Sequence, residues 1–253
     1  AIGNLAMGTG TVSGAQNNTA IGHQALTDIT SADRNVAIGT SVAPNITTGE
    51  RNTVIGADAL GLSTTGLRNV AIGNLAMYAS PASVAVADCV AIGYYALGDG
   101  THTTGANEAV AIGSSALKNL TEGAGNTAVG FEAGKDTTTG ANNTLLGYQA
   151  GQNILGGNNN IAIGTASGET MTGVSSTVLV GKQSGQSINN ADALGTVAIG
   201  HQSLKDLTSG VGNTAVGYLS LDAEDDGDRN TAIGYQALTN QTGTSGIVGN
   251  TAL

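Results

Sequence analysis

The stretch Asn230-Thr-Ala-Ile-Gly-Tyr-Gln-Ala-Leu238 opens with a five-residue word, Asn-Thr-Ala-Ile-Gly, that recurs along the whole chain. Earlier copies are Asn18-Thr-Ala-Ile-Gly22 and Asn35-Val-Ala-Ile-Gly39. A short period of this kind is typical of a repeat architecture in which one coil stacks on the next. Each word ends in an anchor glycine, and the anchors are Gly3, Gly22, Gly39, Gly56, Gly73, Gly93, Gly113, Gly130, Gly147, Gly164, Gly181, Gly200, Gly217 and Gly234.

The intervals between anchors have a fixed minimum. Nine of the thirteen intervals are 17 residues long, and the others are 19 or 20. Because the length varies only upward, the repeat unit tolerates insertions in a loop. We therefore expect residues 1–253 to form one continuous array of about 14 coils. The chain opens with Ala1-Ile2-Gly3, in the middle of a unit, so we also expect it to be a fragment of a longer fibre.

The word itself predicts a short strand followed by a turn. A β-branched residue stands three positions before the anchor, and Ile, Val or Leu stands directly before it. This alternation is typical of a strand, and the glycine marks a position that needs a positive φ or a close backbone approach. The small residue and Leu after the turn predict a second short strand. The expected fold is all-β, a parallel β-roll or β-solenoid with coils of 17–20 residues.

The two faces of the predicted strand differ in composition. Because successive side chains point to opposite faces, the β-branched and Ile positions share one face, and Ala and Asn share the other. We expect the Ile face to fill the interior and the Ala face to contact another copy of the chain around a rotation axis. The alternative is that Ala lines a second, shallow core of a wider single-chain solenoid. The predicted interface residues are Ala20, Ala37, Ala71, Ala91, Ala111, Ala128, Ala162, Ala198, Ala215 and Ala232.

The position four residues before the anchor is Asn in ten of fourteen units. Stacked Asn side chains can form a hydrogen-bonded ladder and cap the turn backbone. We therefore interpret this Asn as structural rather than chemical. Cys89 takes the same position in its unit, where we expect a small, partly buried thiol.

The composition excludes several classes of protein. The chain has 40 Gly, one Phe and no Trp, which is too few large side chains for an ordinary globular core. It has 8 Lys and Arg against 18 Asp and Glu, which argues against binding of nucleic acid or anionic membranes. No apolar run approaches the length of a membrane span. The single Cys excludes an intrachain disulfide and a Cys-cluster zinc site.

The words Asn230–Leu238 and Val197–Ser203 resemble the head repeats of trimeric autotransporter adhesins (YadA-like heads) and related repeats of phage tail fibres. The resemblance covers the whole chain. It implies a left-handed parallel β-roll, three chains per fibre and a role in attachment. The heads of that family have a shorter period, so the extra residues of this chain are expected in outer loops, and the family's binding partners do not transfer.

No catalytic constellation and no cofactor motif accompany the repeat. His23 and His201 follow anchor glycines about ten coils apart, too far to share a metal within one chain. The segment 222–229 concentrates five acidic residues, and a Ca²⁺ site is a candidate there, with a solvated acidic loop as the alternative. Its oxygen ligands would be Asp222, Glu224, Asp226 and Asp228; no other metal ligands are predicted.

Five of the seven aromatic residues directly follow an anchor glycine: Tyr94, Phe131, Tyr148, Tyr218 and Tyr235. Exposed rings in this position could contact a sugar or a partner. The other interpretation, which we favour, is structural: each ring covers the turn and packs on its neighbour in the next coil.

The repeat predicts a non-catalytic, structural protein, and the resemblance implies the shaft or head of an extracellular homotrimeric attachment fibre on a bacterial surface or a virion. Its partners would be two copies of itself and an unidentified host-surface protein or glycan, without nucleic acid and without membrane insertion of this segment. The alternative is a monomeric β-solenoid that binds ice or carbohydrate. Thr does recur three positions before the anchor, but Val interrupts it and it shares a face with the Ile expected to be buried.

Overall fold

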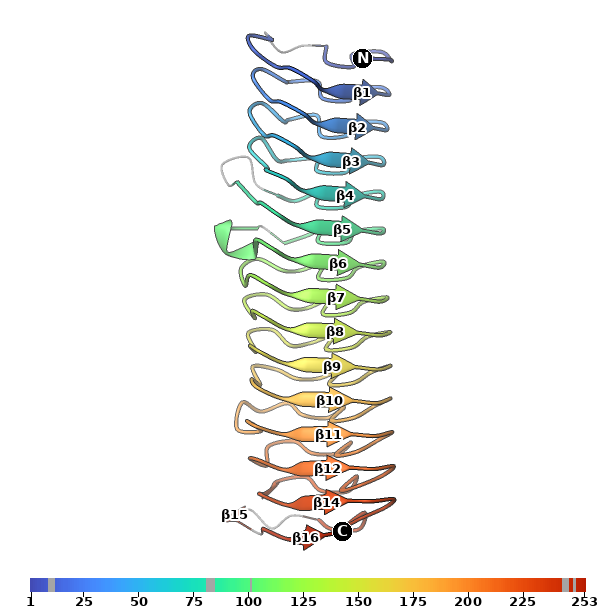
Figure 1. Ribbon diagram of the computed structural model, residues 1–253, viewed down its shortest axis with the longest axis vertical. Helices are drawn as coiled ribbons and strands as arrows, with labels where there is room; N and C mark the ends of the chain where they lie inside the picture. Colours follow the sequence, from blue (N-terminus) through green and yellow to red (C-terminus); the bar gives the residue numbers. More distant parts are fainter. Residues whose placement is uncertain (9–11, 81–84, 101, 243–245, 248) are drawn as a thin grey trace. The chain divides into compact units, whose positions relative to one another are not determined.

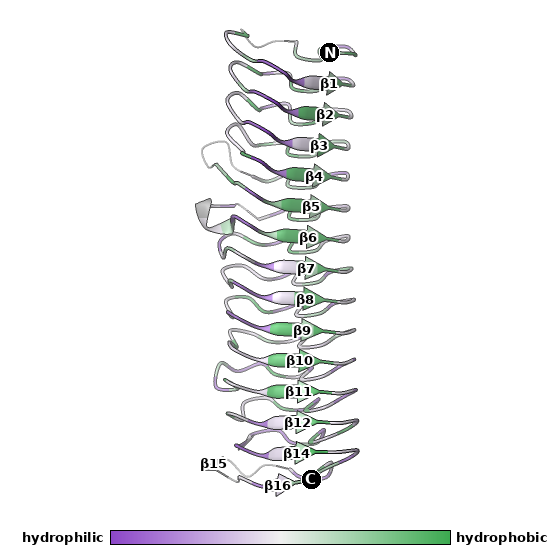
Figure 2. Ribbon diagram, in the orientation of Figure 1, coloured by the Kyte–Doolittle hydropathy of each residue, from purple (hydrophilic) through white to green (hydrophobic). Residues whose placement is uncertain are grey.

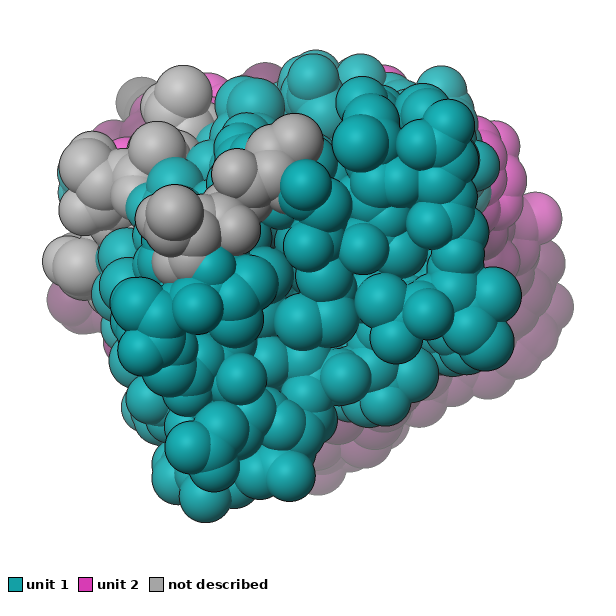
Figure 3. Space-filling model, turned by 90° about the horizontal axis from the view of Figure 1, so that it is seen from above, with its two compact units in different colours: residues 1–125 teal, residues 126–253 magenta. Residues whose placement is uncertain are grey.

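The structure, a computed structural model, describes residues 1–8, 12–80, 85–100, 102–242, 246–247 and 249–253. It divides into two compact units, Ala1–Gly125 and Asn126–Leu253 (Figure 3). Each unit is a stack of parallel strands, one from each repeat, and the prediction of a β-solenoid is confirmed (Figure 1). Among the described residues the only helical segment is the three-residue 3-10 helix η1 (Thr104–Ala106), and none could span a membrane.

Within each unit the strands of the stack are three residues long, except the two-residue β16, and each pairs in register with the next. In the first unit the strands are β1 (Thr19–Ile21), β2 (Val36–Ile38), β3 (Thr53–Ile55), β4 (Val70–Ile72), β5 (Val90–Ile92) and β6 (Val110–Ile112). In the second they are β7 (Thr127–Val129), β8 (Thr144–Leu146), β9 (Ile161–Ile163), β10 (Val178–Val180), β11 (Val197–Ile199), β12 (Thr214–Val216), β14 (Thr231–Ile233) and β16 (Thr251–Ala252), with a separate pair β13 (Gly227–Asp228) and β15 (Gly246–Ile247).

The anchor glycines have both properties that the sequence predicts for them. All fourteen have a positive φ, between 128° and 143°. A Cβ atom on Gly73 would lie 2.5 Å from the carbonyl oxygen of Gly93, which no side chain can tolerate. The 20-residue interval between these two glycines leaves the register intact, because Val70 still pairs with Val90. The insertion is therefore accommodated outside the strand and its turn.

The second strand predicted after each anchor is absent, and this part of the prediction is wrong. The second and fourth residues after the anchor have left-handed φ angles, as at Gln24 (55°) and Leu26 (51°). An extended strand needs φ near −120°, so these residues instead curl the chain into a compact turn. The turn keeps its hydrogen bonds to neighbouring coils: Gln24 N donates to Asn4 O at 3.0 Å, and Leu26 N donates to Val42 O at 3.1 Å.

The assignment of the two strand faces is also wrong. The central residue of each strand is buried inside its own coil, and the residues on either side of it point outward with partial exposure. The alanines predicted to form an interface are all inside: Ala20, Ala37, Ala71, Ala91, Ala111, Ala128, Ala162, Ala198, Ala215 and Ala232 are each at most 1% exposed. A coil of 17 residues encloses so little space that its interior selects small side chains.

Two coils show how tightly this interior is filled. Most coils place Ala at the strand centre and Leu or Met four residues after the anchor. The coils of Leu145 and Leu179 place Leu at the centre and Gly151 or Gly185 after the anchor. A Cβ atom on Gly151 would lie 2.6 Å from Leu145 Cδ2, and one on Gly185 would lie 2.8 Å from Leu179 Cδ2. The large side chain therefore occupies the space that the glycine leaves, which conserves core volume.

The predicted ladder of Asn side chains is confirmed in both units. In the first unit, Asn52 Nδ2 donates to Asn35 Oδ1 at 2.9 Å and to Gly66 O at 2.7 Å. In the second unit, Asn143 Nδ2 donates to Gly157 O at 2.8 Å, and Asn143 Oδ1 accepts from Asn160 N at 2.9 Å. These amides are buried, so each one satisfies backbone groups that water cannot reach.

Replacement of Asn143 by Ala should lower the free energy of unfolding by about 2–4 kcal/mol, because Gly157 O and Asn160 N would be left buried without partners. Denaturant unfolding of the two proteins measures this difference. The matched control is Asn189→Ala, at an exposed position, with an expected change within about 0.5 kcal/mol. Equal losses for the two variants would contradict a structural role of the ladder.

Replacement of Gly147 by Ala should be more severe and should lower the free energy of unfolding by more than about 3 kcal/mol. The φ of Gly147 is +136°, and a Cβ atom there would lie 2.7 Å from Gly164 O. At Gly14 an added Cβ meets nothing within 4 Å, so Gly14→Ala serves as the control and should change stability little. Thermal unfolding followed by circular dichroism separates the two, and a Gly147→Ala protein as stable as the wild type would contradict the close approach of the coils.

Candidate functional site

The outward side chains of the strands form an uncharged surface, which we call the strand face. It consists of the residues one and three positions before each anchor, and all of them are Thr, Val, Ile or Leu. Ile161 at 37% and Ile233 at 43% are among the more exposed large apolar side chains. Figure 2 shows these strands as hydrophobic in β4–β6 and in β9–β11, and paler where Thr opens the strand. Contiguous apolar surface of this kind marks an interaction site more often than it occurs by chance.

The aromatic side chains lie directly beyond this strand face, after the anchor glycines. Tyr218 stacks on Tyr235 with ring centroids 5.2 Å apart, and His201 stacks on Tyr218 at 5.3 Å. Phe131 and Tyr148 form a second stacked pair at 5.3 Å. The prediction that each ring packs on its neighbour in the next coil is confirmed for these pairs.

The stacked rings nevertheless remain accessible. Tyr235 is 73% exposed, and Tyr94, Phe131, Tyr148 and Tyr218 are exposed as well. Tyr94 differs from the others, since it meets Tyr95 of its own coil edge-on at 5.1 Å. The rings thus continue the apolar surface of the strands past the turn and leave flat faces or edges available to a partner.

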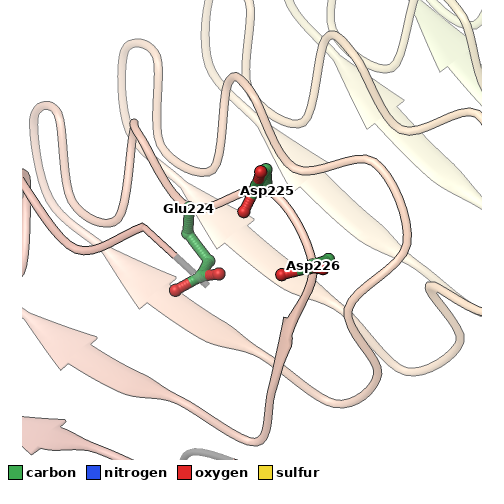
Figure 4. A group of neighbouring side chains, drawn as sticks. All are labelled: Glu224, Asp225 and Asp226. Atoms are coloured by element: carbon green, nitrogen blue, oxygen red, sulfur yellow. The ribbon is translucent and has the colours of Figure 1, made fainter. Parts of the chain in front are cut away.

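The acidic segment brings together only part of the predicted calcium ligands. Ligand atoms of Glu224, Asp225 and Asp226 all lie within 4.8 Å of one another (Figure 4). Asp222 instead accepts a hydrogen bond from Thr239 Oγ1, and Asp228 Oδ1 accepts one from Val211 N at 2.8 Å. Asp225 was missing from the predicted set. A simple motif comparison with a calcium loop overlooks it, whereas alignment of the segment with the Thr-Thr-Gly corners of other coils places these three residues in consecutive corner positions.

The histidines are not brought together among the described residues. His23 belongs to the first unit and His201 to the second, while His102 lies in an inserted segment. The extra residues of the long coils were expected in outer loops, but the His102 side chain is fully buried. Its Nδ1 lies 3.2 Å from Ser80 Oγ, and no described residue forms a hydrogen bond with its Nε2. Burial lowers the pKa of His102 to about 4.

Cys89 is a buried structural thiol. Its Sγ donates to Ala87 O at 3.4 Å and to Ala106 O at 3.3 Å. Burial raises the pKa of the Cys89 thiol to about 11, which disfavours the reactive thiolate. Cys89 continues the ladder on one side only. Its backbone N donates to Asn69 Oδ1 at 3.0 Å, as an Asn in this position does, but its side chain has no amide to offer to the next coil.

No protein-family model, no curated protein and no solved structure matches this chain. The features that bear on function are the strand face, the exposed aromatic rings beyond it, and the acidic corner formed by Glu224, Asp225 and Asp226.

The buried His102 predicts a loss of stability as the pH falls. The unfolded chain takes up a proton near pH 6.5, whereas the folded chain resists protonation until about pH 4. Stability is therefore full above pH 6.5 and declines between the two values, by up to about 1.4 kcal/mol per pH unit. Unfolding of the wild type and of His102→Gln between pH 7 and pH 5 measures this, with a smaller slope expected in the variant. Equal slopes would contradict the prediction.

Proposed function

We propose that this chain is the shaft or head of an extracellular homotrimeric attachment fibre, without catalytic activity, and that its strand face is the contact between chains. The observation that carries the proposal is the strand face itself, which has no charged residue at any of its positions in either unit. The interior of each coil is already filled by the buried strand centres and turn residues. The outward Ile and Val side chains therefore contribute to no core within a single chain.

A second copy of the chain is the partner that fits such a surface best. The strand face repeats once per coil at the spacing of parallel strands, about 4.8 Å. An identical chain has the same repeat, so its outward side chains stay in step with this surface over many coils. In a closed ring of three, each copy contributes the same two adjoining patches, and both can belong to one face turned toward the rotation axis. The number of three chains comes from the resemblance to YadA-like heads.

The attachment role has a narrower basis. It comes from the same resemblance, and the exposed aromatic rings and the inserted loops offer surfaces on which a host protein or glycan could bind. Loops carry recognition more often than the strands that support them. A location on a bacterial surface or a virion belongs to this proposal.

The double variant Ile163→Arg and Ile199→Arg tests the proposed contact. Both side chains point outward, so the coil should still fold, but two unpaired charges would be forced into an apolar interface. We expect the dissociation constant of the trimer to rise by at least about 100-fold. Sedimentation velocity should show three chains of 24.7 kDa in the wild type and single chains in the variant.

The matched control is Thr139→Arg with Ala191→Arg, because both of these side chains are exposed and lie away from the strands. The control should remain trimeric. A wild type that is monomeric at micromolar concentration, or a strand-face variant that assembles normally, would overturn the proposal. The predicted alanines do not serve this test, because Arg at Ala111 or Ala128 would be forced into the interior of the coil.

A monomeric ligand-binding solenoid is the second candidate, and the structure removes one objection to it. The outer residue at the start of the strand is Thr in seven of fourteen units, and it shares its face with partly exposed rather than buried Ile. A regular outward array of Thr could order water, and the stacked rings could bind a sugar. Thermal hysteresis or glycan binding by a monomeric wild type would favour this candidate over the fibre.

A further inference from the structure

The acidic corner contains a carboxylate in a position that other coils fill with an apolar side chain. Glu224 stands seven residues after its anchor, and this position is Ile46, Ile154 or Leu207 in other coils, all fully buried. Glu224 is buried as well, with 0% of its surface exposed. A buried carboxylate costs several kcal/mol unless a partner compensates for it. The partners of its two oxygens therefore decide what the residue does.

The corner at Ser63 shows what this position requires of a polar side chain. Ser63 Oγ accepts a hydrogen bond from Gly66 N at 3.1 Å, three residues further along the chain. Glu224 Oε1 accepts the equivalent bond from Gly227 N at 2.7 Å. A single oxygen thus completes the corner, and Ser supplies it without a charge. The second oxygen of Glu224, Oε2, is buried and has no hydrogen-bond partner among the described residues.

Two further carboxylates converge on the Glu224 side chain. Asp225 and Asp226 follow it directly, and ligand atoms of the three residues lie within 4.8 Å of one another. Asp226 Oδ1 is also buried and has no hydrogen-bond partner in the part of the chain that the structure describes, while Asp225 is exposed. In Figure 4 the carboxylates of Glu224 and Asp226 point toward the same space, with Asp225 beside it.

Nothing in the described part of the chain neutralises this negative charge at Glu224 or Asp226. None of the ion pairs found there involves either residue. Two buried oxygens without donors, next to a third carboxylate, favour a positively charged ligand in the space between them. We propose that Glu224, Asp225 and Asp226 bind a calcium ion, with Glu224 Oε2 as the buried ligand.

The type of ion follows from the ligands. All three residues offer oxygen and none offers nitrogen or sulfur, a set that suits a hard divalent cation. Magnesium demands a near-ideal octahedron at short distances, whereas calcium accepts irregular sets of carboxylates and waters. The exposed Asp225 leaves one side open to water. An open site with three carboxylates corresponds to the weak class of calcium sites, with a dissociation constant of about 0.1–1 mM.

Calorimetric titration of the full chain with calcium chloride tests the proposal. The wild type should bind about one calcium ion per chain at this corner. The dissociation constant should be at least about tenfold higher when magnesium replaces calcium as the titrant, and also when Glu224→Gln is titrated with calcium. Asp226→Asn should also weaken it. The matched control is Asp192→Asn, which removes one exposed carboxylate elsewhere and should leave calcium binding unchanged.

Thermal unfolding supplies a second readout that separates loss of binding from loss of fold. Without metal, Glu224→Gln and Glu224→Ser should melt above the wild type, because repulsion at the corner is relieved and Ser63 shows that Ser fits there. About 10 mM calcium should raise the melting temperature of the wild type by about 5 °C and that of the two variants much less. A wild type that does not respond to calcium, or one that responds no more than Glu224→Gln, would overturn the proposal.

Discussion

Each coil of this protein comes close to the next at the anchor glycine, where the backbones leave no room for a Cβ atom. The φ angle of these glycines is one that other residues rarely adopt, and the carbonyl of the following coil lies where a side chain would begin. The in-register pairing of the strands, the stacking of the Asn amides and the alignment of the aromatic rings all depend on this contact. Residues can be added only where this contact is not disturbed, which explains why the intervals vary upward from a fixed minimum.

Much of the fold could be predicted from the repeat alone. One residue type at one fixed position was enough to predict each of four features: the length of the coil, the strand in each word, the anchor glycine and the Asn ladder. The faces could not be predicted in the same way, because alternation shows that a strand has two faces without showing which one is inside. A signal was present in the exchange at Leu145 and Leu179, because each of these two leucines at a strand centre accompanies a glycine four residues after the anchor. Compensation of this kind occurs between side chains that share one enclosed space.

The predictions of a second strand after the anchor and of the four calcium ligands were inaccurate for a different reason. Leu after a small residue has no strong preference for a left-handed φ, so nothing local warned that the pair at Ala25 and Leu26 forms a turn. At the corner, the composition of residues 222–228 suggested calcium ligands, but their roles depend on position within the coil. Glu224 points inward because it stands in a core position, and Asp228 points to a neighbouring coil because it follows the corner glycine. Register along the repeat, rather than the density of acidic residues, determines which carboxylates meet.

The interruption of the Asn ladder has a consequence for how a fibre would fail under tension. Coils in a stack support only their nearest neighbours, so unfolding spreads from coil to coil like the opening of a zipper. Cys89 and Ala109 stand in two consecutive ladder positions of the first unit, and neither side chain carries an amide to the next coil. The ladder of side-chain amides is therefore interrupted across these two coils. A pulling force along the stack would therefore open the first unit here before its Asn-linked coils, with a thiol beside the break.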